Sequence, residues 1–194
     1  MTSTRLLIAG DSFAAKVKIY TQSAGWPELL AEHFDVTNLA QAGCSEYRIW
    51  QQLVSSDLSK FDCVLVSHTS PYRVPIRQHP IHKSGLHQNC DAIYADVKAH
   101  QVHTLVDFFE NYFDLEHAQH MHQLLGKTIA EHLKSIQSIH ICHMEKNLPC
   151  NYEHMLDFND TWKKYPGPVN HYDSTGNQIV FDQLYNKINE LSSL

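Results

Sequence analysis

The sequence predicts an α/β fold in which a parallel β-sheet is covered by helices on both faces. Short runs rich in β-branched and aliphatic residues, typical of buried strands, alternate along the chain with segments whose apolar residues recur at helical spacing. Strands that are separated by helices pair in parallel, and their crossover helices then cover the two faces of the sheet.

The strand-like runs occur in four places. They are Arg5–Ala9, Val36–Ala40, Cys63–His68 and Ser138–His143. Each is preceded or followed by a helix-period segment, so all four are expected in one sheet.

Four segments are expected to be helices. They cover residues 26–34, 45–58, 116–136 and about 175–191. Pro27 lies near the start of the first, where a missing N–H costs little. Asp114 is expected to cap the third, and Asp173 or Ser174 the last. In the third helix the apolar set expected to face inward is Ala118, Met121, Leu125, Ile129, Leu133 and Ile136.

A long loop insertion is expected at about residues 71–90. This segment is polar and rich in histidine, is interrupted by Pro71, Pro75, Pro80 and Gly85, and has no period of its own. Loops of this length in compact domains usually act as lids or binding loops. No linker or repeat divides the chain, so residues 1–194 are expected to form a single domain.

Composition narrows the class of partner and the compartment. The net charge is -6 and no basic run occurs, which argues against a nucleic-acid partner. No apolar run is long enough to span a membrane, and residues 1–5 lead directly into a strand without a secretory signal. The five cysteines form no C-x-x-C pair. We therefore expect a soluble, cytoplasmic protein that acts on a small molecule or a glycan, with no membrane partner.

A candidate nucleophile follows the first strand. The apolar run ends in Gly10-Asp11-Ser12-Phe13, a turn that would expose the Ser12 hydroxyl while a following helix directs backbone N–H groups at it. A candidate base, His171, precedes the last helix in Asn170-His171-Tyr172-Asp173. The alternatives are that Ser12 is only a helix cap and that His171 is a surface histidine.

Together these segments resemble the SGNH (GDSL-like) hydrolases over nearly the whole chain. The first block is Gly10-Asp11-Ser12, and the last is His171 followed five residues later by Gly176. Asn38-Leu39-Ala40-Gln41-Ala42-Gly43 resembles the second block. The resemblance implies a flavodoxin-like, three-layer α/β/α sandwich with a parallel sheet of about five strands. It also implies that Ser12 attacks an acyl carbonyl, that His171 acts as base, and that the N–H groups of Ser12 and Gly43 bind the oxyanion.

Two positions depart from the family pattern. Where the family has an Asn that donates to the oxyanion, this chain has Thr69, within Ser67-His68-Thr69-Ser70. Where an acid three residues before the histidine would orient the ring, it has Pro168. Thr69 is expected to serve as the third donor, and Asp157, Asp160 or a backbone carbonyl to replace the acid.

The expected function is a serine esterase that removes small O-acyl groups, such as acetyl, from a carbohydrate or small molecule, without a cofactor. Asp11, Tyr72 and Arg73 are the expected substrate-binding residues, although Asp11 also suits a role in fixing the turn. The alternatives are an O-acyltransferase and a weak or inactive SGNH-like protein that binds a glycan or a protein.

The fifteen histidines raise the question of a metal. His100 with His103, and His117 with His120, have the spacing of helical neighbours, but no H-E-x-x-H pattern occurs. No metal is expected, and His79, His82 and His87 are expected to line a cavity mouth or to lie in solvent.

Overall fold

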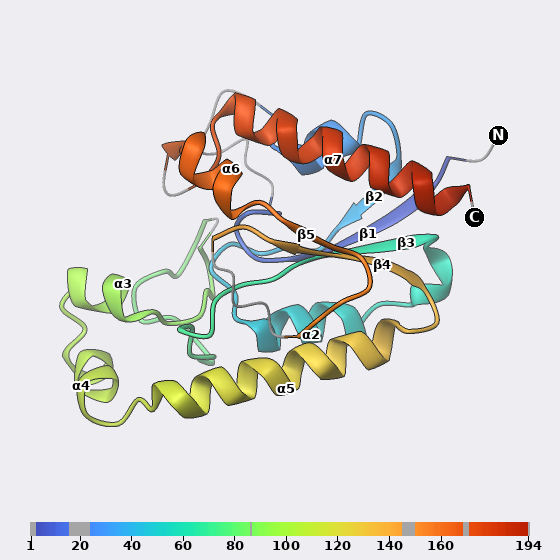
Figure 1. The fold of residues 1–194 in the computed structure, drawn as a ribbon. Coiled ribbons are helices and arrows are strands. Elements are labelled where there is room, and N and C mark those ends of the chain that lie inside the picture. Colours follow the sequence, from blue (N-terminus) through green and yellow to red (C-terminus); the bar gives the residue numbers. More distant parts are fainter. Residues whose placement is uncertain (1–2, 16–23, 86, 145–149, 169–170, 194) are drawn as a thin grey trace.

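The chain folds into three layers, with a five-stranded sheet between two layers of helices (Figure 1). This is a computed structural model, which describes residues 3–15, 24–85, 87–144, 150–168 and 171–193. The predicted α/β class and parallel sheet are therefore confirmed.

The sheet has the strand order β2-β1-β3-β4-β5, and every pair of neighbours is parallel. The strands are β1 (Arg5–Gly10), β2 (Asp35–Asn38), β3 (Cys63–Ser67), β4 (Gln137–Cys142) and β5 (Met155–Asp157). The chain first adds a strand on one side of β1 and then continues on the other side. This reversal between β1 and β3 places a crevice at the carboxyl ends of these two strands, where α/β folds of this kind bind ligands.

Helices cover both faces of the sheet. They are α1 (Trp26–Leu30), α2 (Glu46–Val54), α3 (Tyr94–Ala99), α4 (His103–Asn111), α5 (Leu115–Leu133), α6 (Asn159–Lys164) and α7 (Ser174–Ser192), with a short 3-10 helix at Leu58–Lys60. Figure 1 shows α2 and α5 on one face and α1 and α7 on the other. No helix among the described residues is long and apolar enough to cross a membrane.

Alternation along β1 explains why two cores form. Leu6 and Ile8 point into the core beneath α1 and α7, whereas Leu7 and Ala9 point into the core beneath α2 and α5. All four side chains are fully buried. Since a strand presents successive side chains to opposite faces, a continuous apolar run is what a sheet covered on both sides requires.

The inward face of α5 differs from the prediction. Ile129 and Leu133 are buried as expected, but Met121 is 41 % exposed, and His122 and Gly126 are buried instead. The difference arises because His122 pairs with the buried carboxylate of Glu46, at a distance of 3.5 Å. A polar partner across the interface thus sets the rotation of this helix, and the apolar pattern could not reveal it.

The boundaries of the predicted elements shift by a few residues, and four elements were not predicted. The helix expected over 26–34 ends at Leu30, and the one expected over 45–58 ends at Val54. The additional elements are β5, α3, α4 and α6. Any helix directly after Ser12 would fall on residues 16–23, which lie outside the described residues.

The 71–90 segment has no helix or strand among its described residues, as expected. It is held by an isolated antiparallel bridge between Val74 and Ala92 and by the Asp91 side chain. The five cysteines are free thiols.

Candidate functional site

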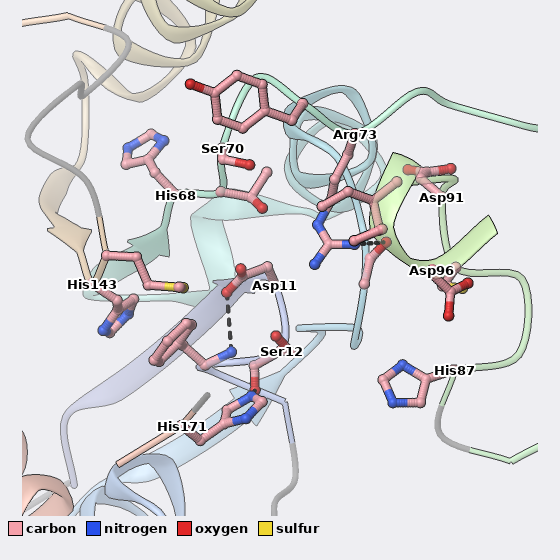
Figure 2. Close-up of a pocket in the computed structure, with 18 of the residues that line it drawn as sticks. Asp11, Ser12, His68, Ser70, Arg73, His87, Asp91, Asp96, His143 and His171 are labelled. Atoms are coloured by element: carbon pink, nitrogen blue, oxygen red, sulfur yellow. Dashed lines mark hydrogen bonds between the residues drawn. The ribbon is translucent and has the colours of Figure 1, made fainter. Parts of the chain in front are cut away.

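A cavity of about 500 Å³ lies at the carboxyl ends of the strands. The turn after β1, the segment after β3 and the loop before α7 all contribute to it, through Ser12, Thr69 and His171 respectively. Figure 2 shows these segments around the cavity, with Asp11 at the end of β1. The residues that the sequence marked as functional are therefore brought to one place, next to the reversal in strand order.

The turn that carries Ser12 is fixed by its neighbour. Asp11 Oδ1 accepts a hydrogen bond from the Phe13 amide at 3.0 Å, and the Asp11 carbonyl accepts the amides of Ala14 and Ala15. Among the described residues, neither the Ser12 amide nor its hydroxyl makes a hydrogen bond within the chain. The turn thus leaves both groups available to a ligand in the cavity.

His171 lies directly beside Ser12. Its Nε2 is 3.1 Å from the backbone carbonyl oxygen of Ser12, and its ring packs against Phe13 with the centroids 4.9 Å apart. The residue is only 7 % exposed, so it is not a surface histidine. Because a carbonyl oxygen only accepts hydrogen bonds, Nε2 carries the proton in this arrangement.

The Ser12 hydroxyl belongs to the residue whose carbonyl contacts this nitrogen. Rotation about its side-chain bond takes only picoseconds to nanoseconds. A catalytic contact needs that rotation together with the ring tautomer that carries its proton on Nδ1.

Gly43 is suited to donate its amide. Its φ of +72° is a conformation that only glycine adopts without strain. Its carbonyl accepts the Asp91 amide at 2.9 Å, but its own N–H makes no hydrogen bond among the described residues. Two unused N–H groups, from Ser12 and Gly43, therefore border the same cavity.

The backbone of Thr69 is already engaged. Its amide donates to Glu46 Oε2 at 3.3 Å, and its carbonyl contacts His122 Nε2 at 2.8 Å. Only the Thr69 hydroxyl is left to act on a ligand.

The two candidate acids for the role missing at Pro168 differ from His171 in burial. Asp157 and Asp160 are exposed, whereas His171 is buried. Asp157 Oδ1 accepts the Asn159 amide at 2.9 Å, at the start of α6. The orienting role expected of these two acids stays a prediction.

A chain of buried polar groups runs beneath the Ser12 turn. Asp11 Oδ1 accepts a hydrogen bond from the Ser67 hydroxyl at 3.2 Å, and the Ser67 Oγ lies 3.0 Å from His143 Nε2. His143 Nδ1 in turn lies 2.8 Å from the Tyr172 hydroxyl. Burial raises the pKa of Asp11 and lowers that of His143 to about 3, so the His143 ring is neutral at pH 7. Asp11 thus fixes the turn from below.

Tyr72 and Arg73 both line the cavity, as predicted. Arg73 Nη1 lies 3.5 Å from the Gly43 carbonyl, and among the described residues its guanidinium pairs with no carboxylate. The nearby charge of Arg73 lowers the pKa of Asp11, which opposes the effect of burial. Arg73 is therefore a cation at the cavity with hydrogen-bonding capacity to spare.

A second buried network lies behind Thr69 and has no counterpart in the sequence motifs. Glu46 Oε1 is 2.6 Å from His68 Nδ1, and His68 Nε2 is 2.9 Å from His140 Nδ1. Hydrogen bonds and nearby charge from His68 and His122 hold the pKa of Glu46 at about 2, although burial alone would raise it. Glu46, His68 and His140 come from three distant segments, which explains why no local pattern identifies them.

Neither of the two histidine pairs with helical spacing belongs to the group of possible metal ligands found among the described residues. His100 follows the end of α3 and His103 begins α4, while His117 and His120 are exposed on α5.

Comparison with known proteins bears on the fold alone. No protein-family model matches the chain, and no curated protein sequence matches it significantly. The structure is similar to the crystal structure of a protein from Lactobacillus plantarum solved by the Northeast Structural Genomics consortium, with a TM-score of 0.50 and 11% sequence identity over 98% of each chain. At this identity the likeness supports the three-layer α/β/α architecture and carries no activity across.

Proposed function

We propose that this protein is a serine esterase of the SGNH type that hydrolyses small O-acyl groups, with Ser12 as nucleophile and His171 as general base. The observation that carries the proposal is the position of His171 beside Ser12, with Nε2 3.1 Å from the Ser12 backbone carbonyl oxygen. Both residues line a cavity that Ser12 and Gly43 border with unused N–H groups. A base, a nucleophile and oxyanion donors in one place are the requirements of acyl transfer.

In the proposed reaction, the Ser12 oxygen forms a bond to the acyl carbon and gives its proton to His171 Nε2. The amides of Ser12 and Gly43 hold the oxyanion. The carbon–oxygen bond to the leaving alcohol then breaks, and His171 returns the proton to that alcohol. Water attacks the acyl-enzyme by the same steps, which frees the acid and restores Ser12.

The absence of a carboxylate at position 168 makes a slow enzyme the expectation. An acid in that place would hold the proton on Nδ1 and leave Nε2 free to act as base. Here the resting ring instead directs its Nε2 proton at the Ser12 carbonyl. Each turnover therefore begins from the less favourable tautomer.

Size and charge favour a compact, polar ester. The cavity of about 500 Å³ is bordered by Arg73 and by five histidines, His68, His82, His87, His143 and His171. Arg73 can take a carboxylate, phosphate or carbonyl oxygen of the alcohol or acyl part.

The test is the hydrolysis of p-nitrophenyl acetate by wild type and by Ser12→Ala. We expect turnover by the wild type that Ser12→Ala loses, with His33→Ala, an exposed position in the turn between α1 and β2, as a control that keeps it. Equal turnover by wild type and Ser12→Ala, or none by either, would contradict the proposal.

Acyl transfer is the second candidate, since an alcohol can replace water at the acyl-enzyme. Mass spectrometry of the products formed with an acetylated sugar and a second glycan as acceptor separates the two reactions. Acetylated glycan as the main product would favour the transferase.

A further inference from the structure

The wall of the cavity across from His143 holds a cluster of metal-binding side chains. Figure 2 shows Asp96 and His87 on this side of the cavity. The ligand atoms of His79, His82 and Cys90 all lie within 4.8 Å of one another. All three come from the irregular 71–90 segment, where the sequence indicates only a polar loop.

Asp96 completes the cluster. Its Oδ2 lies 3.0 Å from His82 Nε2 and 3.4 Å from His79 Nε2. Its other oxygen, Oδ1, lies 3.3 Å from His100 Nδ1, which is also 3.0 Å from the Asp96 backbone oxygen. Carboxylates that bind a metal are commonly contacted by further polar groups in the outer shell, and His100 is such a group here.

His79 is the observation that points to a missing ligand. The residue is fully buried, and its Nε2 makes no hydrogen bond in the described structure, although Asp96 Oδ2 lies 3.4 Å away. A buried polar nitrogen without a partner is destabilising unless something binds it.

We propose that His79, His82, Cys90 and Asp96 form a binding site for one divalent transition-metal ion, with zinc as the first candidate. Two imidazole nitrogens, a thiolate and a carboxylate suit tetrahedral zinc or cobalt and do not suit magnesium or calcium, which prefer oxygen ligands. The charges of the thiolate and the carboxylate balance the charge of the ion.

Binding involves defined proton movements. Cys90 can bind the ion only as a thiolate, so its thiol proton is released when the ion binds. His79 Nδ1 accepts the amides of Ile81 and His82 at 3.3 and 3.2 Å. Ligation through Nε2 moves the ring proton to Nδ1 and releases these two long contacts. The turn at residues 79–82 is therefore expected to rearrange on loading.

The proposed ion lies at the wall of the cavity, where it would hold the 71–90 segment in place. His82, Cys90 and Asp96 border the cavity together with Ser12. Cys90 also packs against Gly43, so closely that a Cβ on Gly43 would lie 2.7 Å from the Cys90 Cβ. The ion therefore links the loop to the segment that supplies a proposed oxyanion donor.

The test is metal uptake by the full chain after removal of bound metals with a chelator. Zn²⁺ is titrated calorimetrically, and Co²⁺ is titrated by absorption, which reports a thiolate ligand as a near-ultraviolet charge-transfer band. We expect one ion per chain, a thiolate band, and shifted amide signals of Ile81 and His82 in NMR spectra.

Three variants assign the ligands. Cys90→Ser should remove the thiolate band, and His82→Ala and Asp96→Asn should weaken zinc binding by about a hundredfold, since even outer-shell changes cost about 10- to 100-fold. His103→Ala, an exposed histidine on α4, is the matched control and should bind as the wild type does. His79→Ala is avoided because its burial puts folding at risk. No uptake by the wild type, or uptake that Cys90→Ser and His82→Ala leave unchanged, would overturn the proposal.

Discussion

The cavity has two walls that are built in different ways. The strand-end wall (Ser12, Gly43 and His171) follows strands or precedes a helix, so hydrogen bonds of the sheet and of helix ends hold its backbone. The loop wall (His82, His87, Cys90 and Asp96) belongs mostly to irregular chain and is held by carboxylates. The residues of the strand-end wall are placed by strands and helix ends, so short sequence motifs can identify them. The residues of the loop wall are placed by side-chain contacts between distant positions, so no short motif identifies them.

Asp91 shows how the loop wall is attached. This residue is 1% exposed, and its carboxylate accepts from the Ser45 amide at 2.8 Å, from Arg48 Nε at 2.8 Å and from the Ile76 amide at 3.2 Å. One side chain thus joins the start of α2 to the 71–90 segment.

The largest effect that we expect is on the strand-end wall. His171→Gln should lower p-nitrophenyl acetate hydrolysis at least about a hundredfold, because general-base catalysis contributes about 10²- to 10⁴-fold. Zinc binding should stay as in the wild type. His117→Gln, an exposed change on α5, is the control. Activity within a factor of about three of the wild type would remove His171 from the mechanism.

Asp91→Ala should have the next largest effect, on the loop wall. Removing one partner of a buried ion pair costs about 3 to 5 kcal/mol, and because Arg48 is 24% exposed we expect the lower end, about 3 kcal/mol. Urea unfolding measures this loss. The matched control is Asp62→Ala, which breaks the exposed pair with Arg5 and should cost no more than about 1 kcal/mol. Equal losses in the two variants would show that Asp91 does not anchor the loop.

The polar networks behind the strand-end wall predict how stability depends on pH. The pKa values of His140 and His143 are lowered to about 2 and about 3, so the unfolded chain binds more protons than the folded one below the ordinary histidine value of 6.5. Stability is therefore complete above about pH 6.5 and falls as the pH drops toward 3, by up to about 1.4 kcal/mol per pH unit for each histidine. Glu46, with a pKa of about 2, adds a loss that begins below its ordinary value of 4.5.

Urea unfolding midpoints at a series of pH values check this expectation. His143→Gln should reduce the slope of the unfolding free energy against pH between about pH 6 and pH 4 by the contribution of one titrating proton. A stability that stays constant over this range would contradict the assignment of neutral, buried rings.

Thr69→Ala should have the smallest effect. Glu46 and His122 hold the backbone of Thr69, and only its short hydroxyl can act on a ligand. We expect less than about a tenfold loss of hydrolysis, against the hundred- to thousandfold (~10²–10³) typical of a full oxyanion donor. A hundredfold or larger loss of hydrolysis in Thr69→Ala would show that Thr69 is a main oxyanion donor.

Much of the fold could be predicted because β1, β3 and β4 are buried runs between helices of clear period. β5 and α6 were missed because they have only three and six residues, and α4 because none of its residues is buried. The turn at Ser12 and the glycine at position 43 are local features, so the sequence identified both.

Features that depend on distant side chains escaped prediction. The burial of His122 in place of Met121 is decided by Glu46, which lies on another helix. The grouping of His79, His82 and Cys90 with Asp96 depends on the path of a loop without a period. Neither can be derived from spacing along the chain.

The most direct test of the central claim is covalent labelling of Ser12. The protein is treated with a fluorophosphonate, an analogue that phosphonylates activated serines and is not released, and the label is located by peptide mass spectrometry. We predict one label, on Ser12, that is absent in Ser12→Ala and forms more slowly in His171→Gln. No label, or a label on another residue at the same rate in both variants, would contradict the account of Ser12 as an activated nucleophile.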